Sequence, residues 1–226
     1  MTDIEVNDFV TLMNGTSFIK TDIAVPYDTM MSEFNNFKDN NTIDLVAFKT
    51  DAIRQFNLDV LGLIDLVEDP QQAGSYILGN MGKNLVVQRT SMYKYFPKTI
   101  DWIFENIPGV FRCKISRLQS GKTTVWHDHP HRLQKFDAVL HIPLVSNPNV
   151  KMQVRQKNNP AFEESCHFST GSLWYFNSGP NIEHSVTNNG TEDRWHLWIN
   201  AIVIDKYSNA KNQQLVDALI RSRTIL

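Results

Sequence analysis

The stretch GSLWYFNSGPNIEHSVTNNG, residues 171–190, decides how the C-terminal half of the chain is interpreted. Ser172–Phe176 and His184–Thr187 are short runs in which aromatic, β-branched and other apolar residues are frequent. A turn signal comes soon after each run, Ser-Gly-Pro after the first and Asn-Asn-Gly after the second. This composition favours short β-strands closed by turns.

The same pattern of short strand-like runs and turn signals extends from Phe111 to Ile204. We predict further strands at Phe111–Leu118, Thr123–His129, Ala138–Val145, Met152–Gln156 and Arg194–Ile204. Turn signals separate them at Ser120-Gly121, Asn147-Pro148-Asn149 and Asn158-Asn159-Pro160. Many short strands at this spacing predict a mainly β domain of the sandwich, jelly-roll or barrel type.

The flanking segments mix strand-like and helix-like patterns. We expect strands at Ser17–Lys20, Leu45–Phe48 and Asn84–Gln88, a polar loop at Asn35–Asn41, and helices at Ala52–Val67, Pro97–Ile107 and within Asn209–Leu226. The expected organisation is a single domain over residues 1–226, with an N-terminal β/α extension (1–95), a β core (96–208) and a C-terminal helix (209–226).

Composition restricts the function classes. Of the 226 residues, 42% are hydrophobic and 20% charged, which is ordinary for a folded globular protein. The net charge of −2 gives no basic excess for nucleic acid, and no polybasic run or long apolar stretch indicates a membrane. Two cysteines, Cys113 and Cys166, and an acidic N-terminus without an apolar core predict a cytoplasmic protein with reduced thiols. Nothing in the sequence indicates the oligomeric state.

All seven histidines lie between His127 and His196, so metal or acid–base chemistry is expected in the C-terminal half. On a strand, His127 and His129 point to one side and Asp128 to the other. Two ligands at this spacing and a third from a distant strand form a facial metal site with open positions, the arrangement of non-haem iron oxygenases. The competing interpretation is a surface loop that happens to contain several histidines.

His184 and Arg194 form a second pair, ten residues apart. We predict that His184 completes the metal site and that Arg194 binds a carboxylate in bidentate fashion. The plainer alternative is a histidine at a strand end and a solvated surface arginine. Arg194 opens the apolar run Trp195–Ile199, however, and a charge in a partly buried place needs a partner.

Taken in order, these blocks resemble the aspartyl/asparaginyl β-hydroxylase and proline hydroxylase group of 2-oxoglutarate oxygenases. The similarity covers about Pro97 to Ile204 and rests on Ser116–Gly121, His127 six residues after Gly121, His141–Pro148, Gly171–Phe176, His184–Asn188 and Arg194–Ile199. It implies a double-stranded β-helix, a cupin-like jelly roll with flanking α-helices. It also implies a hydroxylase that uses Fe(II), 2-oxoglutarate and O2 on a small-molecule or peptide substrate, releasing succinate and CO2.

The resemblance implies a role for individual residues. His127 and His184 would bind Fe(II), and Arg194 would pair with the distal carboxylate of 2-oxoglutarate, with Ser116 bonded to the same group. His141 and Lys135 stand near positions that face cosubstrate or substrate in the family. Trp126, with Trp174, Trp195 and Trp198, would exclude water or contact substrate, although core packing explains each of them as well.

The chain departs from the family pattern at one position. Most 2-oxoglutarate oxygenases have an acid two residues after the first histidine, where this chain has His129. The third ligand is therefore open: His129 by strand alternation, Asp128 if the strand bulges there, or Asp137 as a more distant choice. Water is a further alternative, since some aspartyl β-hydroxylases also lack the acid and use two histidines.

Two other functions fit part of the pattern. Gly121, His127-x-His129 and His184 with Asn188 partly match the two cupin motifs, which serve enzymes and binding proteins that do not use 2-oxoglutarate. The glutamate that a cupin needs after the second histidine is missing, since Gln134 and Lys135 stand there, and Arg194 has no role in that scheme. The third function is a β-sandwich binding module that has lost its metal.

Overall fold

The computed structural model describes residues 17–40, 58–68, 85–107, 109–128, 137–176, 178, 181–202, 204–205, 210–211 and 213–223. Within these residues the helices are α2 (Tyr27–Asn40), α4 (Pro97–Asn106), α5 (Gln213–Arg223) and the 3₁₀ turn η2 (Ser91–Lys94). None of the helices in these ranges is long and apolar enough to cross a bilayer.

The strands form two main antiparallel sheets. Their bounds are β1 (Phe18–Lys20), β2 (Leu58–Glu68), β3 (Leu85–Arg89), β4 (Val110–Leu118), β5 (Asp137–Val145), β6 (Val150–Gln156), β7 (Asn159–Cys166), β8 (Trp174–Phe176), β9 (Ile182–Asn188), β10 (Arg194–Ile202), β11 (Ile204–Asp205) and β12 (Ala210–Lys211). The large sheet has the order β1-β8-β5-β10-β4-β2-β3, and the small sheet has the order β7-β6-β9. β11 and β12 pair separately.

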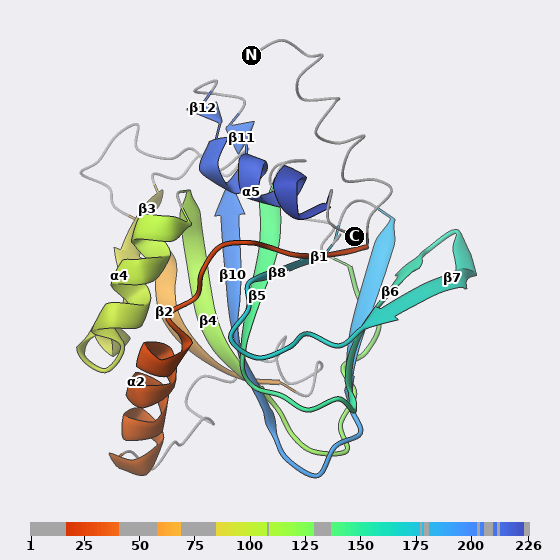
Figure 1. Ribbon diagram of the computed structural model, residues 1–226, viewed down its shortest axis with the longest axis horizontal. Helices are drawn as coiled ribbons and strands as arrows, with labels where there is room; N and C mark the ends of the chain where they lie inside the picture. The colour runs from red at the N-terminus through yellow and green to blue at the C-terminus, as the bar shows by residue number, and fades with distance from the viewer. Residues whose placement is uncertain are drawn as a thin grey trace.

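The two sheets and the helices form layers (Figure 1). Alternate residues of β10 face opposite sides of the large sheet, as the strand period requires. Trp195, Leu197 and Ile199 join the core beneath α2, α4 and α5. A second apolar cluster, which includes Leu118, Met152 and Val186, fills part of the space between the two sheets. The chain is therefore a mainly β jelly roll, a double-stranded β-helix with flanking helices, as the sequence predicts.

The predicted elements of the β region are confirmed with small changes of boundary. β4, β5, β6, β8, β9 and β10 correspond to six of the seven predicted strands, and β1, β3, α4 and α5 correspond to predicted flanking elements. Residues 123–128 are extended and form only single bridges, Thr123 to Thr187 and His127 to His184, rather than a continuous strand. The predicted strand Leu45–Phe48 lies outside the described residues.

The predicted helix at Ala52–Val67 is wrong over its described part, which is strand β2. β2 pairs with β4, and the register shifts between Gly62 and Ile64. This bulge inserts one residue, so Leu61 and Ile64, three residues apart, both reach the core beneath the helices. A strand with one bulge thus imitates helical spacing.

Two more expectations are wrong. Asn35–Asn40 is not a loop but the last part of α2, because Met30, Phe34 and Phe37 bury one face of a helix whose other face is polar. Asn159-Pro160 is not part of a turn but the start of β7. β7 pairs with β6 and ends the small sheet, and proline is tolerated on such an edge strand.

Candidate active site

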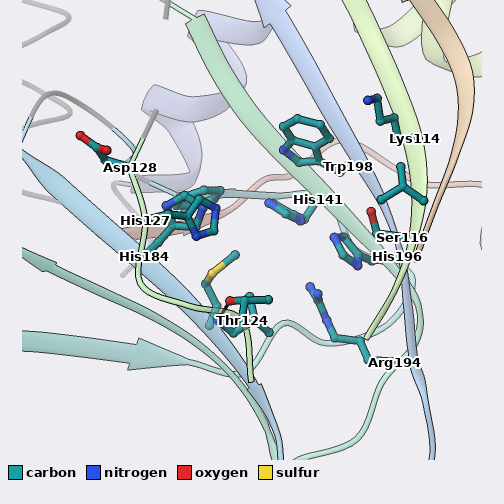
Figure 2. Close-up of a pocket in the computed structure, with 14 residues that line it drawn as sticks. Lys114, Ser116, Thr124, His127, Asp128, His141, His184, Arg194, His196 and Trp198 are labelled. Atoms are coloured by element: carbon teal, nitrogen blue, oxygen red, sulfur yellow. Dashed lines mark hydrogen bonds between the residues drawn. The ribbon is translucent and has the colours of Figure 1, made fainter. Parts of the chain in front are cut away.

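A cavity of about 240 Å³ lies between the sheets. Its walls come from β2, β4, β5, β8 and β10 of the large sheet, from β6 and β9 of the small sheet, and from the segment Thr124–Asp128 (Figure 2). Arg194, His196 and Trp198 point into it because they alternate with the core residues of β10. His196 pairs with Ser116 of β4, and Trp198 stands between Lys114 of β4 and His141 of β5.

His127 and His184 meet at one wall of this cavity. Each backbone N–H donates to the other residue's carbonyl, at 3.1 Å from His127 and 2.8 Å from His184. The two ring centroids are 4.1 Å apart. The Nδ1 of His127 lies 2.8 Å from the carbonyl oxygen of Val125. Since a carbonyl only accepts, Nδ1 carries the proton and Nε2 is the basic nitrogen of that ring.

Burial is the main reason why the pKa of His127 lies below its ordinary value. At neutral pH the ring is therefore in the neutral form that binds metals. His184 is only 5% exposed. The two imidazoles thus have the chemical character of a pair of metal ligands.

None of the described candidates for a third ligand is shown beside the two imidazoles. The carboxylate of Asp128 is ion-paired with Lys157 at 2.6 Å and lies apart from the two imidazoles (Figure 2). Asp137 is the first residue of β5 and pairs with Ile202. His129 and Lys135 lie outside the described residues. Within the described ranges, no three His, Cys, Asp or Glu side chains gather closely enough to hold a metal.

Arg194 lies at the deep end of the cavity and is 1% exposed. Its Nε and Nη1 have no hydrogen-bond partner among the described residues. Burial lowers the pKa of the guanidinium to about 9, so it remains charged at neutral pH. An unpaired buried cation is strongly unfavourable, and an anionic ligand at this place would relieve that.

His196 lies next to this arginine and stacks on a second histidine. His141 and His196 stack with centroids 5.0 Å apart, and each is 4% exposed. The Nδ1 of His196 has no hydrogen-bond partner within the described ranges. Burial first, then the charge of Arg194 and the proximity of His141, keep the pKa of His196 well below its ordinary value. His196 is therefore neutral and able to donate one hydrogen bond.

Sequence interpretation missed His196 and Lys114 as cavity residues. Both were detectable by strand alternation, since His196 follows Arg194 by two residues and Lys114 precedes Ser116 by two. The four tryptophans that the family resemblance places around the site lie in different environments. Trp198 lines the cavity, whereas Trp195 packs on Phe34, Trp174 stacks on Phe168, and Trp126 packs against Arg155.

The chain is similar to several solved structures at low sequence identity. A prolyl hydroxylase from Trichoplax adhaerens, solved with a hypoxia inducible factor oxygen degradation domain peptide fragment, is 13% identical, with a TM-score of 0.48 and coverage of 89% of this chain and 94% of that one. A Pseudomonas putida prolyl-4-hydroxylase is 15% identical, with a TM-score of 0.46 and coverage of 87% and 96%. A 2OG-Fe(II) oxygenase family oxidoreductase from Burkholderia pseudomallei is 12% identical, with a TM-score of 0.43 and coverage of 64% and 67%.

No curated protein sequence matches the chain. The family model for aspartyl/asparaginyl beta-hydroxylase matches residues 26–202, most of the chain. That range contains the paired histidines, the buried arginine, the small sheet and all of the large sheet except β1. The chain therefore belongs to the aspartyl/asparaginyl β-hydroxylase family and is a non-haem iron oxygenase of the 2-oxoglutarate-dependent class.

Proposed function

We propose that this protein hydroxylates an amino acid, or an Asp, Asn or Pro residue of a peptide, with release of succinate and CO2. The observation that carries the proposal is Arg194, a fully buried guanidinium whose Nε and Nη1 have no partner among the described residues. A dicarboxylate cosubstrate provides the anion that such a side chain requires.

His127 and His184 are the proposed Fe(II) ligands. Imidazole suits this metal, and two neutral rings held side by side leave positions open for other ligands. His129 is the first candidate for a third ligand, by the alternation argument from the sequence. The ion pair between Asp128 and Lys157 makes that carboxylate a weaker candidate.

The deep end of the cavity is the proposed site for the distal carboxylate of 2-oxoglutarate. Arg194 would supply a bidentate charged contact, and the hydroxyl of Ser116 would bond the same group. His196 lies opposite Ser116 in the β10–β4 register, and its neutral ring is suited to add a third donor. These three side chains come from two adjacent strands, so their spacing is fixed by the sheet.

When bound, Fe(II) with 2-oxoglutarate would supply the oxidising chemistry, which consumes O2, releases succinate and CO2 and hydroxylates a substrate C–H bond. The chain's own contribution is position and exclusion of water. Met152, Phe176, Val186 and Trp198 give the cavity an apolar lining. In that lining, a charged contact from Arg194 is stronger than it would be in water.

The test is a thermal-shift titration of the Mn(II)-loaded protein with 2-oxoglutarate, followed by a succinate-release assay with Fe(II). We expect 2-oxoglutarate to raise the melting temperature, and Arg194→Met to abolish the shift. Arg117→Met is the matched control, because Arg117 lies on β4 but pairs with Trp195, which faces the other side of the sheet.

Two results would contradict the proposal. A metal-dependent shift without any response to 2-oxoglutarate would favour a cupin-type activity. Absence of both uncoupled and substrate-stimulated succinate release, over a panel of amino acids and Asp-, Asn- and Pro-containing peptides, would remove the hydroxylase function itself.

A further inference from the structure

We propose that Lys114, on the wall it shares with Trp198, forms a second anion subsite that selects substrates carrying a carboxylate near the carbon that is oxidised. This inference rests on the proposed function, since it assigns the deep end of the cavity to the cosubstrate. It adds a substrate class and a residue that determines it.

Lys114 and Arg194 occupy different ends of the same cavity. Lys114 pairs with Trp198, and Arg194 pairs with Leu118, in the antiparallel register of β10 and β4. Four residues of strand, about 13 Å at ~3.3 Å per residue, separate the two levels. Figure 2 shows Ser116 and His196 between the two cationic side chains. A single carboxylate in contact with Arg194 is therefore not placed to serve Lys114.

The balance of charge in the cavity favours a second anion. Its lining contains two cationic side chains, Lys114 and Arg194, and one carboxylate, Asp128. That carboxylate is already engaged by Lys157. Among the described residues, no carboxylate lies within ion-pair distance of Lys114, and Asp65, which acts on it electrostatically, is bonded to Arg112 at 3.0 Å. Fe(II), Lys114 and Arg194 would together carry four positive charges against the two negative charges of 2-oxoglutarate, so a further anion improves the balance among the described residues.

The partly buried surroundings of Lys114 make its unpaired charge energetically unfavourable. Its Nζ lies 5.8 Å from the centre of the Trp198 ring, a distance at which the aromatic face compensates only part of the charge. Burial, and then the charge of Arg112, lower its pKa from the ordinary value. A carboxylate at this point would restore the favourable interaction that partial burial removes.

Trp198 forms the apolar wall of the proposed subsite. The same residue pairs with His141 on its other side, so its indole lies on the wall between Lys114 and the histidines (Figure 2). A flat apolar wall next to a cation suits a small molecule with a hydrocarbon part and a carboxylate. The substrate class that fits is an amino acid or other short carboxylic acid, presented as the free acid and not as its amide.

The first test is direct binding with propionate and propionamide, which have nearly the same shape and differ in charge. Each is titrated anaerobically, by NMR, into protein loaded with Mn(II) and saturated with 2-oxoglutarate. We expect propionate to bind and propionamide not to bind. Lys114→Met should weaken propionate by about tenfold, the size expected of a partly screened charge contact, and Lys114→Arg should restore most of it.

Lys20→Met is the matched control, because Lys20 also lies over a tryptophan, 6.0 Å from the Trp174 ring, but does not line the cavity. It should leave propionate binding unchanged. Equal binding of propionate and propionamide, or unchanged propionate affinity in Lys114→Met, would overturn the inference. So would a loss of 2-oxoglutarate affinity in Lys114→Met with propionate unaffected, since that would assign Lys114 to the cosubstrate.

The second test is turnover with the twenty free L-amino acids and their primary amides. Acids that stimulate succinate release should do so at least tenfold more efficiently than their amides, and Lys114→Met should reduce this preference through KM. Equal stimulation of succinate release by amides and by acids would contradict the inference. These outcomes differ from a failure of the proposed function, in which 2-oxoglutarate itself would produce neither a thermal shift nor succinate.

Discussion

His127 and His184 are joined by a two-hydrogen-bond antiparallel bridge that brings their ring centroids to 4.1 Å. The bridge uses backbone atoms only. The position of the two imidazoles is therefore set by chain pairing and not by the rings themselves. This arrangement allows either ring to be removed while the segment that presents it stays paired.

The first prediction concerns metal affinity. His127→Ala or His184→Ala should weaken Mn(II) binding by more than the ~10–100-fold that loss of an outer-shell partner costs, because a direct ligand is removed. His167→Ala is the control, since His167 bonds the carbonyl of Val150 and does not line the cavity. An electron paramagnetic resonance titration of free Mn(II) measures all three. Equal affinity for the His184→Ala variant and the control would refute the ligand assignment.

The second prediction concerns the stability of the ligand-free protein. Arg194→Met should raise its free energy of unfolding by about 1–4 kcal/mol, because an unpaired buried charge is replaced by an apolar side chain of similar length. The same variant should lose the stabilisation by 2-oxoglutarate. Urea unfolding with and without the cosubstrate separates the two effects. A marked loss of stability without ligand would mean that Arg194 has a structural partner.

The mainly β fold is predictable because short strand-like runs between Phe111 and Ile204 are separated by clear turn signals, and the family resemblance then implies the double-stranded β-helix. In β10, polar Arg194 and His196 face the cavity while Trp195 and Leu197 face the helices, and this period of two is readable without a structure. Arg194 is expected from its place at the start of an apolar run and from the family resemblance, and Ser116 from the resemblance alone. Strand alternation extends the same face to His196 and Lys114, to which the resemblance gives no role.

The errors have local physical causes. β2 was predicted as a helix because one bulge places Leu61 and Ile64 on the same face at a spacing of three. The edge strand β7 is not visible in the sequence because its described side chains are mostly exposed, so no apolar face marks it, and because Asn159-Pro160 is a turn signal in most contexts. Neither a bulge nor a polar edge strand leaves a regular apolar pattern in the sequence.

The third prediction compares two glycines with the same backbone conformation. Gly171 and Gly121 have φ of 68° and 70°, in the left-handed region where an alanine costs about 1–2 kcal/mol. A Cβ on Gly121 would meet nothing within 4 Å, whereas a Cβ on Gly171 would lie 3.0 Å from Cγ of Tyr27. Tyr27 cannot move away easily, because its hydroxyl donates to the carbonyl of Leu144 at 2.8 Å.

Gly171→Ala should therefore destabilise the protein more than Gly121→Ala, by roughly 1 kcal/mol or more for a crowded contact. Chemical denaturation of the two variants measures the difference directly. Equal losses would show that backbone conformation alone matters at Gly171 and that α2 gives way to the added methyl group.

The last prediction concerns Thr124, which ties the segment of His127 to strand β9. Its Oγ1 accepts from the backbone N–H of Val186 at 2.8 Å, and its carbonyl accepts from the hydroxyl of Ser185 at 2.7 Å. Thr124 is 2% exposed, so water cannot replace the first bond if the hydroxyl is lost. Thr124→Val should leave the N–H of Val186 unsatisfied, at a cost of about 1–3 kcal/mol.

Because His184 and His127 are presented by the two segments that this bond joins, Thr124→Val should also weaken Mn(II) binding, although Thr124 is not a proposed ligand. Thr124→Ser keeps the hydroxyl and should restore both stability and affinity. Thr123→Val is the control: the Thr123 hydroxyl also bonds β9, at 3.2 Å to Oγ1 of Thr187, but that bond is exposed and water can replace it, so the variant should change neither property by more than about 0.5 kcal/mol. If Thr124→Val lowers stability but leaves Mn(II) affinity intact, the pairing of the segments does not position the imidazoles.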